Sequence, residues 1–189
     1  SQKRFSIMYK ELDDILITEE AIRQRTREMG KEISDLYGDE EISVISIING
    51  AIIFTADLLR TITSPVRLDC IRVSSYRNST TPQVAPHVLD NIKLDVAGRH
   101  VLIIDDILDT GKTISKVVDI LSELNPASLR SCMLLEKQVT RSVKYHANFV
   151  GFTIPDKFVV GYGLDFAGRY RNIPVIGVLK PELQSVGAV

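Results

Sequence analysis

The sequence predicts an α/β protein with a mostly parallel sheet flanked by helices. Short runs of β-branched and other apolar residues recur through the middle of the chain, and segments with apolar residues at helical spacing lie between them. The chain has 189 residues, 44% of them hydrophobic, which is enough to bury one core. Because no repeat or linker-like tract divides the sequence, we expect a single domain over residues 1–189.

The first elements expected are a helix, a strand and a second helix. Thr18 can cap a helix that ends near Gly38. Residues 42–48 are largely β-branched, as in a strand, Asn49-Gly50-Ala51 forms a tight turn, and residues 54–59 begin the second helix. The apolar positions of the first helix are Ile22, Met29, Ile33 and Leu36.

Strands and helices continue to alternate after this point. Residues 66–73 are expected to form a strand, and residues 74–86, rich in Ser, Thr, Asn and Pro, a long mobile loop. Residues 101–104 are typical of a strand buried on both faces. The next helix has an apolar stripe of Ile114, Val117, Val118, Leu121 and Leu124. Further strands are expected at residues 129–135, 158–162 and 175–179.

Composition excludes several functions. Lys and Arg number 23 against 24 for Asp and Glu, so no general positive charge would hold nucleic acid or an anionic membrane. Cys70 and Cys132 lie in apolar runs, as buried thiols do in a reducing compartment, and no long apolar stretch is present, so a cytoplasmic location is expected. The histidines lack metal-ligand spacing: His87, His100 and His146.

The most informative segment runs from Val101 to Thr113, where a strand delivers Asp105 and Asp106, then Asp109, and then a turn into a helix. The turn over residues 109–113 can aim backbone N–H groups and two threonine hydroxyls at a phosphate. Adjacent carboxylates beside it suit magnesium or sugar hydroxyls, although the pair could be only a solvated loop start and Asp109 only a helix cap. A P-loop is excluded, because it requires glycine where Asp106 stands.

This segment resembles the phosphoribosyl pyrophosphate signature of type I phosphoribosyltransferases: an apolar run, two acids, two apolar residues, Asp, Thr or Ser, and Gly. Further segments, in matching order and spacing, resemble the hypoxanthine-guanine branch: residues 47–51 its pyrophosphate loop, Ser75-Tyr76 its lid, and Lys137 with residues 154–165 its purine pocket. The resemblance extends from about Ile42 to Leu179. It implies the family's fold with a small purine-binding hood, and transfer of the 5-phosphoribosyl group to hypoxanthine or guanine with Mg²⁺, giving IMP or GMP plus pyrophosphate.

The resemblance also implies a role for each matching residue. Asp109 would be the catalytic base toward the purine N7 proton, and Ser75 and Tyr76 would close over the site. Ribose and 5-phosphate binding is implied for Asp105, Asp106, Asp109, Thr110, Gly111, Lys112 and Thr113. Metal binding is implied for Asp105, Asp106 and Asp165, and pyrophosphate binding for Asn49, Gly50, Arg171 and, less directly, Arg169. Purine binding is implied for Lys137 at O6, Phe158 by stacking, Val159 through its backbone, and Asp165.

Some alternatives stay open at this point. By sequence alone Lys137 could be a solvated strand end and Phe158 an ordinary core residue. Some family members carry lysine where Asn49 stands, and in some the peptide before it is cis. A regulator with this fold that binds nucleic acid, or a transferase preferring xanthine, would share the central signature. The partners expected are the small-molecule substrates, with no nucleic acid and no membrane, and self-association as a homodimer or homotetramer is expected by analogy.

Overall fold

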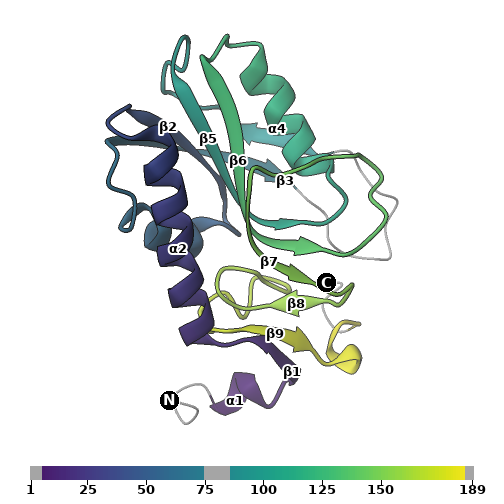
Figure 1. The fold of residues 1–189 in the computed structure, drawn as a ribbon. Coiled ribbons are helices and arrows are strands. Elements are labelled where there is room, and N and C mark those ends of the chain that lie inside the picture. Colours follow the sequence, from purple (N-terminus) through teal and green to yellow (C-terminus); the bar gives the residue numbers. More distant parts are fainter. Residues whose placement is uncertain (1–5, 75–85, 186–189) are drawn as a thin grey trace.

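A computed structural model describes residues 6–74 and 86–185 and contains two sheets (Figure 1). The larger sheet has the strand order β4-β3-β2-β5-β6-β7, and the smaller has the order β1-β9-β8. In the larger sheet the strands are β2 (Ile42–Ile48), β3 (Val66–Ser74), β4 (His87–Asp90), β5 (His100–Leu108), β6 (Ser128–Lys137) and β7 (Phe149–Ile154). The smaller sheet comprises β1 (Leu12–Ile17), β8 (Val159–Val160) and β9 (Ile176–Leu179).

All pairs in the larger sheet are parallel except β3 with β4. Ser46 of β2 lies opposite Cys70 of β3 and Ile104 of β5, so the three central strands run in register toward a common edge. The smaller sheet is antiparallel. The predicted class, a mostly parallel sheet flanked by helices, is confirmed.

Helices cover both faces of the larger sheet. On one face α2 (Glu19–Tyr37) and α3 (Ile52–Leu59) pack through Met29, Ile33 and Phe54 against apolar residues of β2, β5 and β6. On the other face α4 (Lys112–Ser122) packs through Ile114, Val117 and Leu121. Figure 1 shows α2 running alongside both sheets. A short helix α1 (Ser6–Tyr9) and a 3₁₀ turn η2 (Pro181–Leu183) lie near the ends of the described chain.

The first predicted helix is confirmed, but its apolar stripe needs a correction. The Thr18 hydroxyl accepts a hydrogen bond from the Ala21 N–H at 3.2 Å, as expected of a cap. Leu36 is 50% exposed, whereas Tyr37 is buried. The apolar stripe therefore continues from Ile33 to Tyr37, four positions later, rather than to Leu36. Leu124 is likewise exposed, because α4 ends two residues before it.

Several strand predictions also need correction. β5 continues to Leu108, so both neighbouring acids lie inside the strand rather than after it. β8 has only two residues, and Phe158 precedes it. The second helix begins at Ile52 rather than at Phe54. β1, β4 and β7 were not predicted, and most of the expected loop, residues 75–85, falls outside the described part of the chain.

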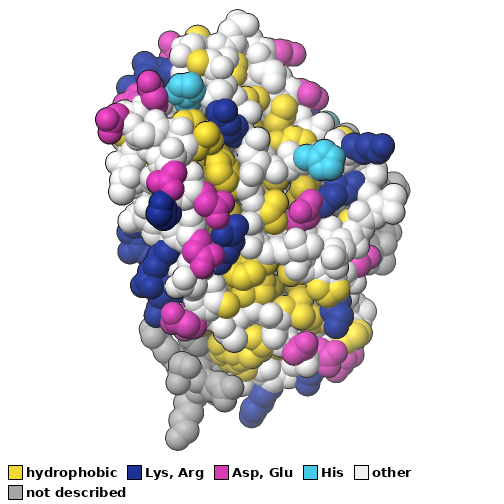
Figure 2. Space-filling model, viewed as in Figure 1, with side chains coloured by type: hydrophobic (Ala, Val, Ile, Leu, Met, Phe, Trp, Pro, Cys, Tyr) yellow, Lys and Arg dark blue, Asp and Glu magenta, His cyan; other side chains and the backbone are white. Residues whose placement is uncertain are grey.

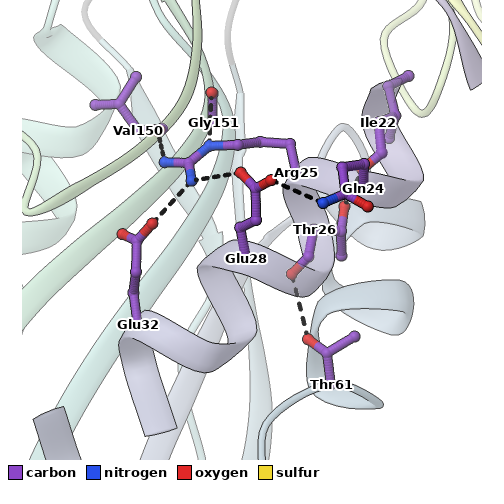
Figure 3. A network of polar contacts seen from close by, with 9 residues as sticks. All are labelled: Ile22, Gln24, Arg25, Thr26, Glu28, Glu32, Thr61, Val150 and Gly151. Carbon is purple, nitrogen blue, oxygen red and sulfur yellow. Dashed lines mark hydrogen bonds and ion pairs between the residues drawn. The ribbon is translucent and has the colours of Figure 1, made fainter. Parts of the chain in front are cut away.

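Arg25 fastens α2 to the edge strand β7 (Figure 3). Its Nε donates to the Gly151 carbonyl at 3.0 Å and its Nη2 to the Val150 carbonyl at 2.8 Å. Its Nη1 pairs with Glu32 at 2.8 Å and with Glu28 at 3.3 Å. Burial alone would lower the pKa of Arg25, but these ion pairs outweigh the effect of burial, so the pKa is raised. This helix therefore supplies donors to carbonyl groups along the edge strand of the sheet.

Candidate active site

The candidate site lies where the parallel strands end and the smaller sheet begins. β2, β5, β6 and β7 have their carboxyl ends at one edge, and the chain passes from the end of β7 at Ile154 to β8 of the smaller sheet within five residues. A Cβ atom on Gly163, beyond β8, would lie 2.3 Å from the carbonyl oxygen of Gly50, beyond β2. The two sheets thus meet at the carboxyl edge, where α/β proteins bind ligands.

Two buried acids form the floor of the site. Asp105 is 5% exposed and Asp106 is 3% exposed, so the pair is not a solvated loop start. The Asp106 N–H donates to Asp105 Oδ1 at 2.8 Å. A Cβ atom on Gly50 would lie 2.0 Å from Asp106 Oδ2, so only glycine lets the turn after β2 reach this carboxylate. The peptide bond between Ile48 and Asn49 in the same turn is cis.

The turn from β5 into α4 is tight, and within it the Lys112 N–H donates to Thr110 Oγ1 at 3.3 Å. Gly111 is the N-cap residue and has a φ of 80°, and a Cβ atom there would lie 2.4 Å from the Val143 carbonyl oxygen. The Val143 N–H donates to the Thr110 carbonyl at 3.1 Å, which holds the turn. Because glycine caps the helix, the Asp109 side chain is not its cap, and the helix amino terminus faces the turn.

Lys137, the last residue of β6, and Asp109, the first residue after β5, are brought together. The Lys137 ammonium lies 3.3 Å from Asp109 Oδ2 and 3.7 Å from Asp156 Oδ1. The Lys137 side chain is 11% exposed, so it is not a solvated strand end. A hydrogen-bond acceptor and a donor therefore stand side by side at the edge of the sheet. Asp156 lies in the segment 154–165 that the resemblance grouped with Lys137, but no role was assigned to Asp156 itself.

Aromatic rings lie at the start of β8. The Phe158 ring meets the Phe166 ring edge-on, with centroids 5.5 Å apart and planes at 89°. Val159, the next residue, is buried in the strand. Phe166 was missed by the sequence analysis, because the loop that carries it has no periodic pattern. Its position directly after Asp165 is the one signal that could have indicated it.

The two arginines predicted to bind pyrophosphate, Arg171 and Arg169, make different contacts. Arg171 lies 3.2 Å from Asp165 Oδ1 and donates to the Gly163 carbonyl at 2.6 Å, so it belongs to the loop that touches Gly50. Arg169 is 63% exposed, pairs with Glu11 at 3.4 Å and lies over the Tyr170 ring. Its side chain therefore contacts Glu11, the residue before β1, and Tyr170 rather than Asp165.

The acids alone do not form a metal cage. Among residues 6–74 and 86–185, no group of three or more His, Cys, Asp or Glu side chains could hold a metal ion. Mg²⁺ commonly takes one or two carboxylates and completes its shell with water and substrate phosphates. Asp105 and Asp106 beside a phosphate cradle fit that pattern. His100 lies at the start of β5, at the opposite end from the site, with Nδ1 2.7 Å from Ser128 Oγ.

A mostly parallel sheet whose carboxyl edge carries buried acids and a glycine turn into a helix is typical of α/β domains that bind phosphorylated ligands at that edge. The phosphoribosyl transferase domain model matches residues 11–167, and the chain belongs to this family. The family resemblance found in the sequence motifs is therefore confirmed.

The chain is 41% identical over 177 residues to the hypoxanthine-guanine phosphoribosyltransferase of Bacillus subtilis, covering 94% of this chain and 98% of that protein. It matches the solved structure of a hypoxanthine phosphoribosyltransferase from Staphylococcus aureus with a TM-score of 0.88 at 35% identity, covering 94% of this chain and 96% of that one. It is also 39% identical over 178 residues to the bifunctional protein TilS/HprT of Listeria monocytogenes, and it spans 28% of that protein's length.

Proposed function

We propose that the chain, as one domain over residues 1–189, is a purine salvage enzyme that transfers the 5-phosphoribosyl group of phosphoribosyl pyrophosphate to hypoxanthine or guanine. The products are IMP or GMP and pyrophosphate. The observation that carries the proposal is the pair formed by Asp109 and Lys137 at 3.3 Å, beside the buried acids of β5 and the turn into α4. Relatives with hypoxanthine or guanine in their names support the choice of base.

The Asp109 and Lys137 pair suits the edge of a 6-oxopurine. The carboxylate accepts the proton that leaves N7 as N9 of the base bonds to the anomeric carbon, and the ammonium donates to O6. An aminopurine presents a donor at that position, which would face another donor. Adenine is therefore expected to be a poor substrate, and Phe158 supplies a ring for stacking on the base.

The acids and the turn hold the ribose phosphate. Asp105 and Asp106 bind the ribose hydroxyls, and the backbone and hydroxyl groups of residues 110–113 bind the 5-phosphate. Asp105 and Asp106 are the residues that would hold one Mg²⁺ and Asp165 the one that would hold a second, and the metal would neutralise charge on the pyrophosphate. The backbone of Asn49 and Gly50 and the Arg171 guanidinium bind pyrophosphate, whereas the contacts of Arg169 with Glu11 weaken its assignment to that role.

Water competes with the purine for the anomeric carbon, so the reaction needs a cover. Ser75 and Tyr76 are our proposal for that lid, and both lie outside the described residues. The free thiols of Cys70 and Cys132 support a cytoplasmic location, and burial raises the pKa of the Cys132 thiol. We also propose self-association as a homodimer or homotetramer, with the substrates as the other partners.

A coupled assay tests this function. The full chain is incubated with phosphoribosyl pyrophosphate and each of hypoxanthine, guanine, xanthine and adenine, with Mg²⁺ or with excess chelator. Mg²⁺-dependent formation of IMP and GMP with little AMP is the expected result. A preference for xanthine would replace the assignment of the base. No transfer to any base, together with a gel shift of RNA or DNA at physiological salt, would favour a nucleic-acid-binding regulator instead.

A further inference from the structure

The segment that follows β6 carries one more residue for this reaction. We propose that Arg141 is a positioning residue that holds Lys137 and the turn over residues 109–113 in their relative places. The inference rests on the proposed function, because it concerns the same site. Arg141 does not touch the groups assigned to the substrates, and it acts through the backbone that carries them.

Arg141 grips the end of the strand that carries the purine-facing lysine. Its side chain is 16% exposed. Its Nη2 donates to Glu136 Oε1 at 2.7 Å and to the backbone carbonyl of Lys137 at 3.1 Å. One nitrogen therefore restrains the last two residues of β6, including the residue whose ammonium reaches Asp109.

The next two residues grip the phosphate turn. Ser142 Oγ donates to the Thr110 carbonyl at 3.3 Å, and the Val143 N–H donates to the same carbonyl at 3.1 Å. The Val143 carbonyl packs against Gly111 so closely that a Cβ atom there would lie 2.4 Å away. The segment 141–143 thus contacts β6 on one side and the β5–α4 turn on the other.

The incomplete hydrogen bonding of the Arg141 guanidinium argues against a purely stabilising role. Its Nε is buried and has no hydrogen-bond partner among the described residues. A buried donor without an acceptor destabilises a fold, so its removal offsets part of the cost of breaking the contacts with Glu136, whose side chain is 25% exposed to water, and with the Lys137 carbonyl. Replacing the guanidinium is therefore expected to lower the stability only modestly, whereas it releases the Lys137 carbonyl and allows the lysine to move relative to Asp109. Small displacements of reacting groups lower rates strongly.

The test compares Arg141→Met, Arg141→Lys and wild type in the full chain. For each we measure the melting temperature, kcat, and KM for guanine and for phosphoribosyl pyrophosphate. Arg141→Met is expected to melt within about 4 °C of wild type and to lose at least about tenfold in kcat/KM for guanine. Arg141→Lys is expected to regain part of that loss, because an ammonium can still donate to Glu136 or the Lys137 carbonyl.

Arg99→Ala is the matched control, since Arg99 pairs with Glu41 at 3.1 Å just before β5, at the opposite end of the strands. It should leave all kinetic constants unchanged. A folded Arg141→Met with wild-type constants would overturn the inference. If that variant does not fold, Arg141→Lys decides: reduced kcat/KM in a folded protein supports the inference, and wild-type constants overturn it. An inactive wild type would refute the proposed function itself.

Discussion

Asp109 and Lys137 are important for their placement at the site more than for the stability of the fold. The Asp109 side chain is 45% exposed, so its ion pair contributes little to folding. The pair matters because it orders an acceptor and a donor at a fixed separation. The sequence motif indicated Asp109 directly, but Lys137 could be assigned only through the family resemblance, because nothing local shows that its ammonium turns back toward β5.

Asp109→Asn tests the base. The amide keeps the size of the side chain but cannot take up a proton, so turnover is expected to fall roughly 10²-fold or more, with phosphoribosyl pyrophosphate binding nearly intact. Single-turnover kinetics and a binding titration measure the two effects. Asp35→Asn is the control, because Asp35 is exposed on α2, where it pairs with Lys31 at 2.5 Å, and it should keep full activity. Near-normal turnover of Asp109→Asn would show that Asp109 is not the catalytic base.

Phe158→Ala tests the stacking surface. Loss of the ring should weaken GMP binding by about 1–3 kcal/mol, as loss of an aromatic platform does for a base. It also removes the edge contact with Phe166, whose centroid lies 5.5 Å away. Calorimetric titration with GMP measures the change, and the KM for phosphoribosyl pyrophosphate serves as the internal control. Unchanged GMP affinity would place the purine pocket elsewhere.

Arg169 and Arg171 mark a limit of sequence reasoning. They lie two positions apart in one loop, and the resemblance implied pyrophosphate binding for Arg171 and, less directly, for Arg169. Arg171 turns to Asp165, six residues before it, whereas Arg169 reaches Glu11 near the other end of the chain. No local pattern distinguishes them, because the choice depends on a contact between distant segments.

The helices and the central strands were predictable because their signals are local. α2 and α4 show helical periodicity, β2 is rich in β-branched residues, and β5 contains a continuous apolar run from Val101 to Ile104. β1 and β8 were missed or misplaced, because each is stabilised by pairing with β9 rather than by its own pattern. β1 contains two consecutive acids, Asp13 and Asp14, among its six residues. They interrupt the alternation of apolar and polar residues that would indicate a strand.

Gly50→Ala tests the contact between the turn after β2 and the acid of β5. The new methyl group would lie 2.0 Å from Asp106 Oδ2, so the turn or the carboxylate must move. A shift of this size is expected to cost on the order of 10²-fold in kcat/KM for phosphoribosyl pyrophosphate. Gly98→Asn is the control, since Gly98 has open space around it and Asn tolerates its φ of 68°. Equal activity of both variants would contradict the account.

Asp69 ties β3 to the segment that follows β4. Its carboxylate accepts from the N–H groups of Cys70, Lys93 and Leu94. Burial alone would raise the pKa of Asp69, but these hydrogen bonds outweigh it and lower the pKa. The stability they contribute is present above the unfolded-state pKa of about 3.9 and is lost as the pH falls through the lower folded-state value. Asp69→Asn should flatten the fall in melting temperature below about pH 4, and an unchanged acid limb would contradict this.

At the scale of the whole molecule, positive and negative side chains are nearly equal in number. The formal net charge is −1, and Figure 2 shows acidic and basic side chains intermingled on the face in view rather than gathered by sign. The face in view thus carries no extended basic patch. No helix in the described ranges is long and apolar enough to cross a membrane. Phosphate recognition is therefore expected to reside in the local cradle beside β5.

The most direct test of the central claim is a crystal structure of the chain with GMP bound. We predict that the 5′-phosphate accepts hydrogen bonds from backbone N–H groups and hydroxyls of residues 110–113, with the ribose hydroxyls at Asp105 and Asp106. The base should lie between Lys137 and Phe158. A phosphate bound away from the β5–α4 turn would contradict the account.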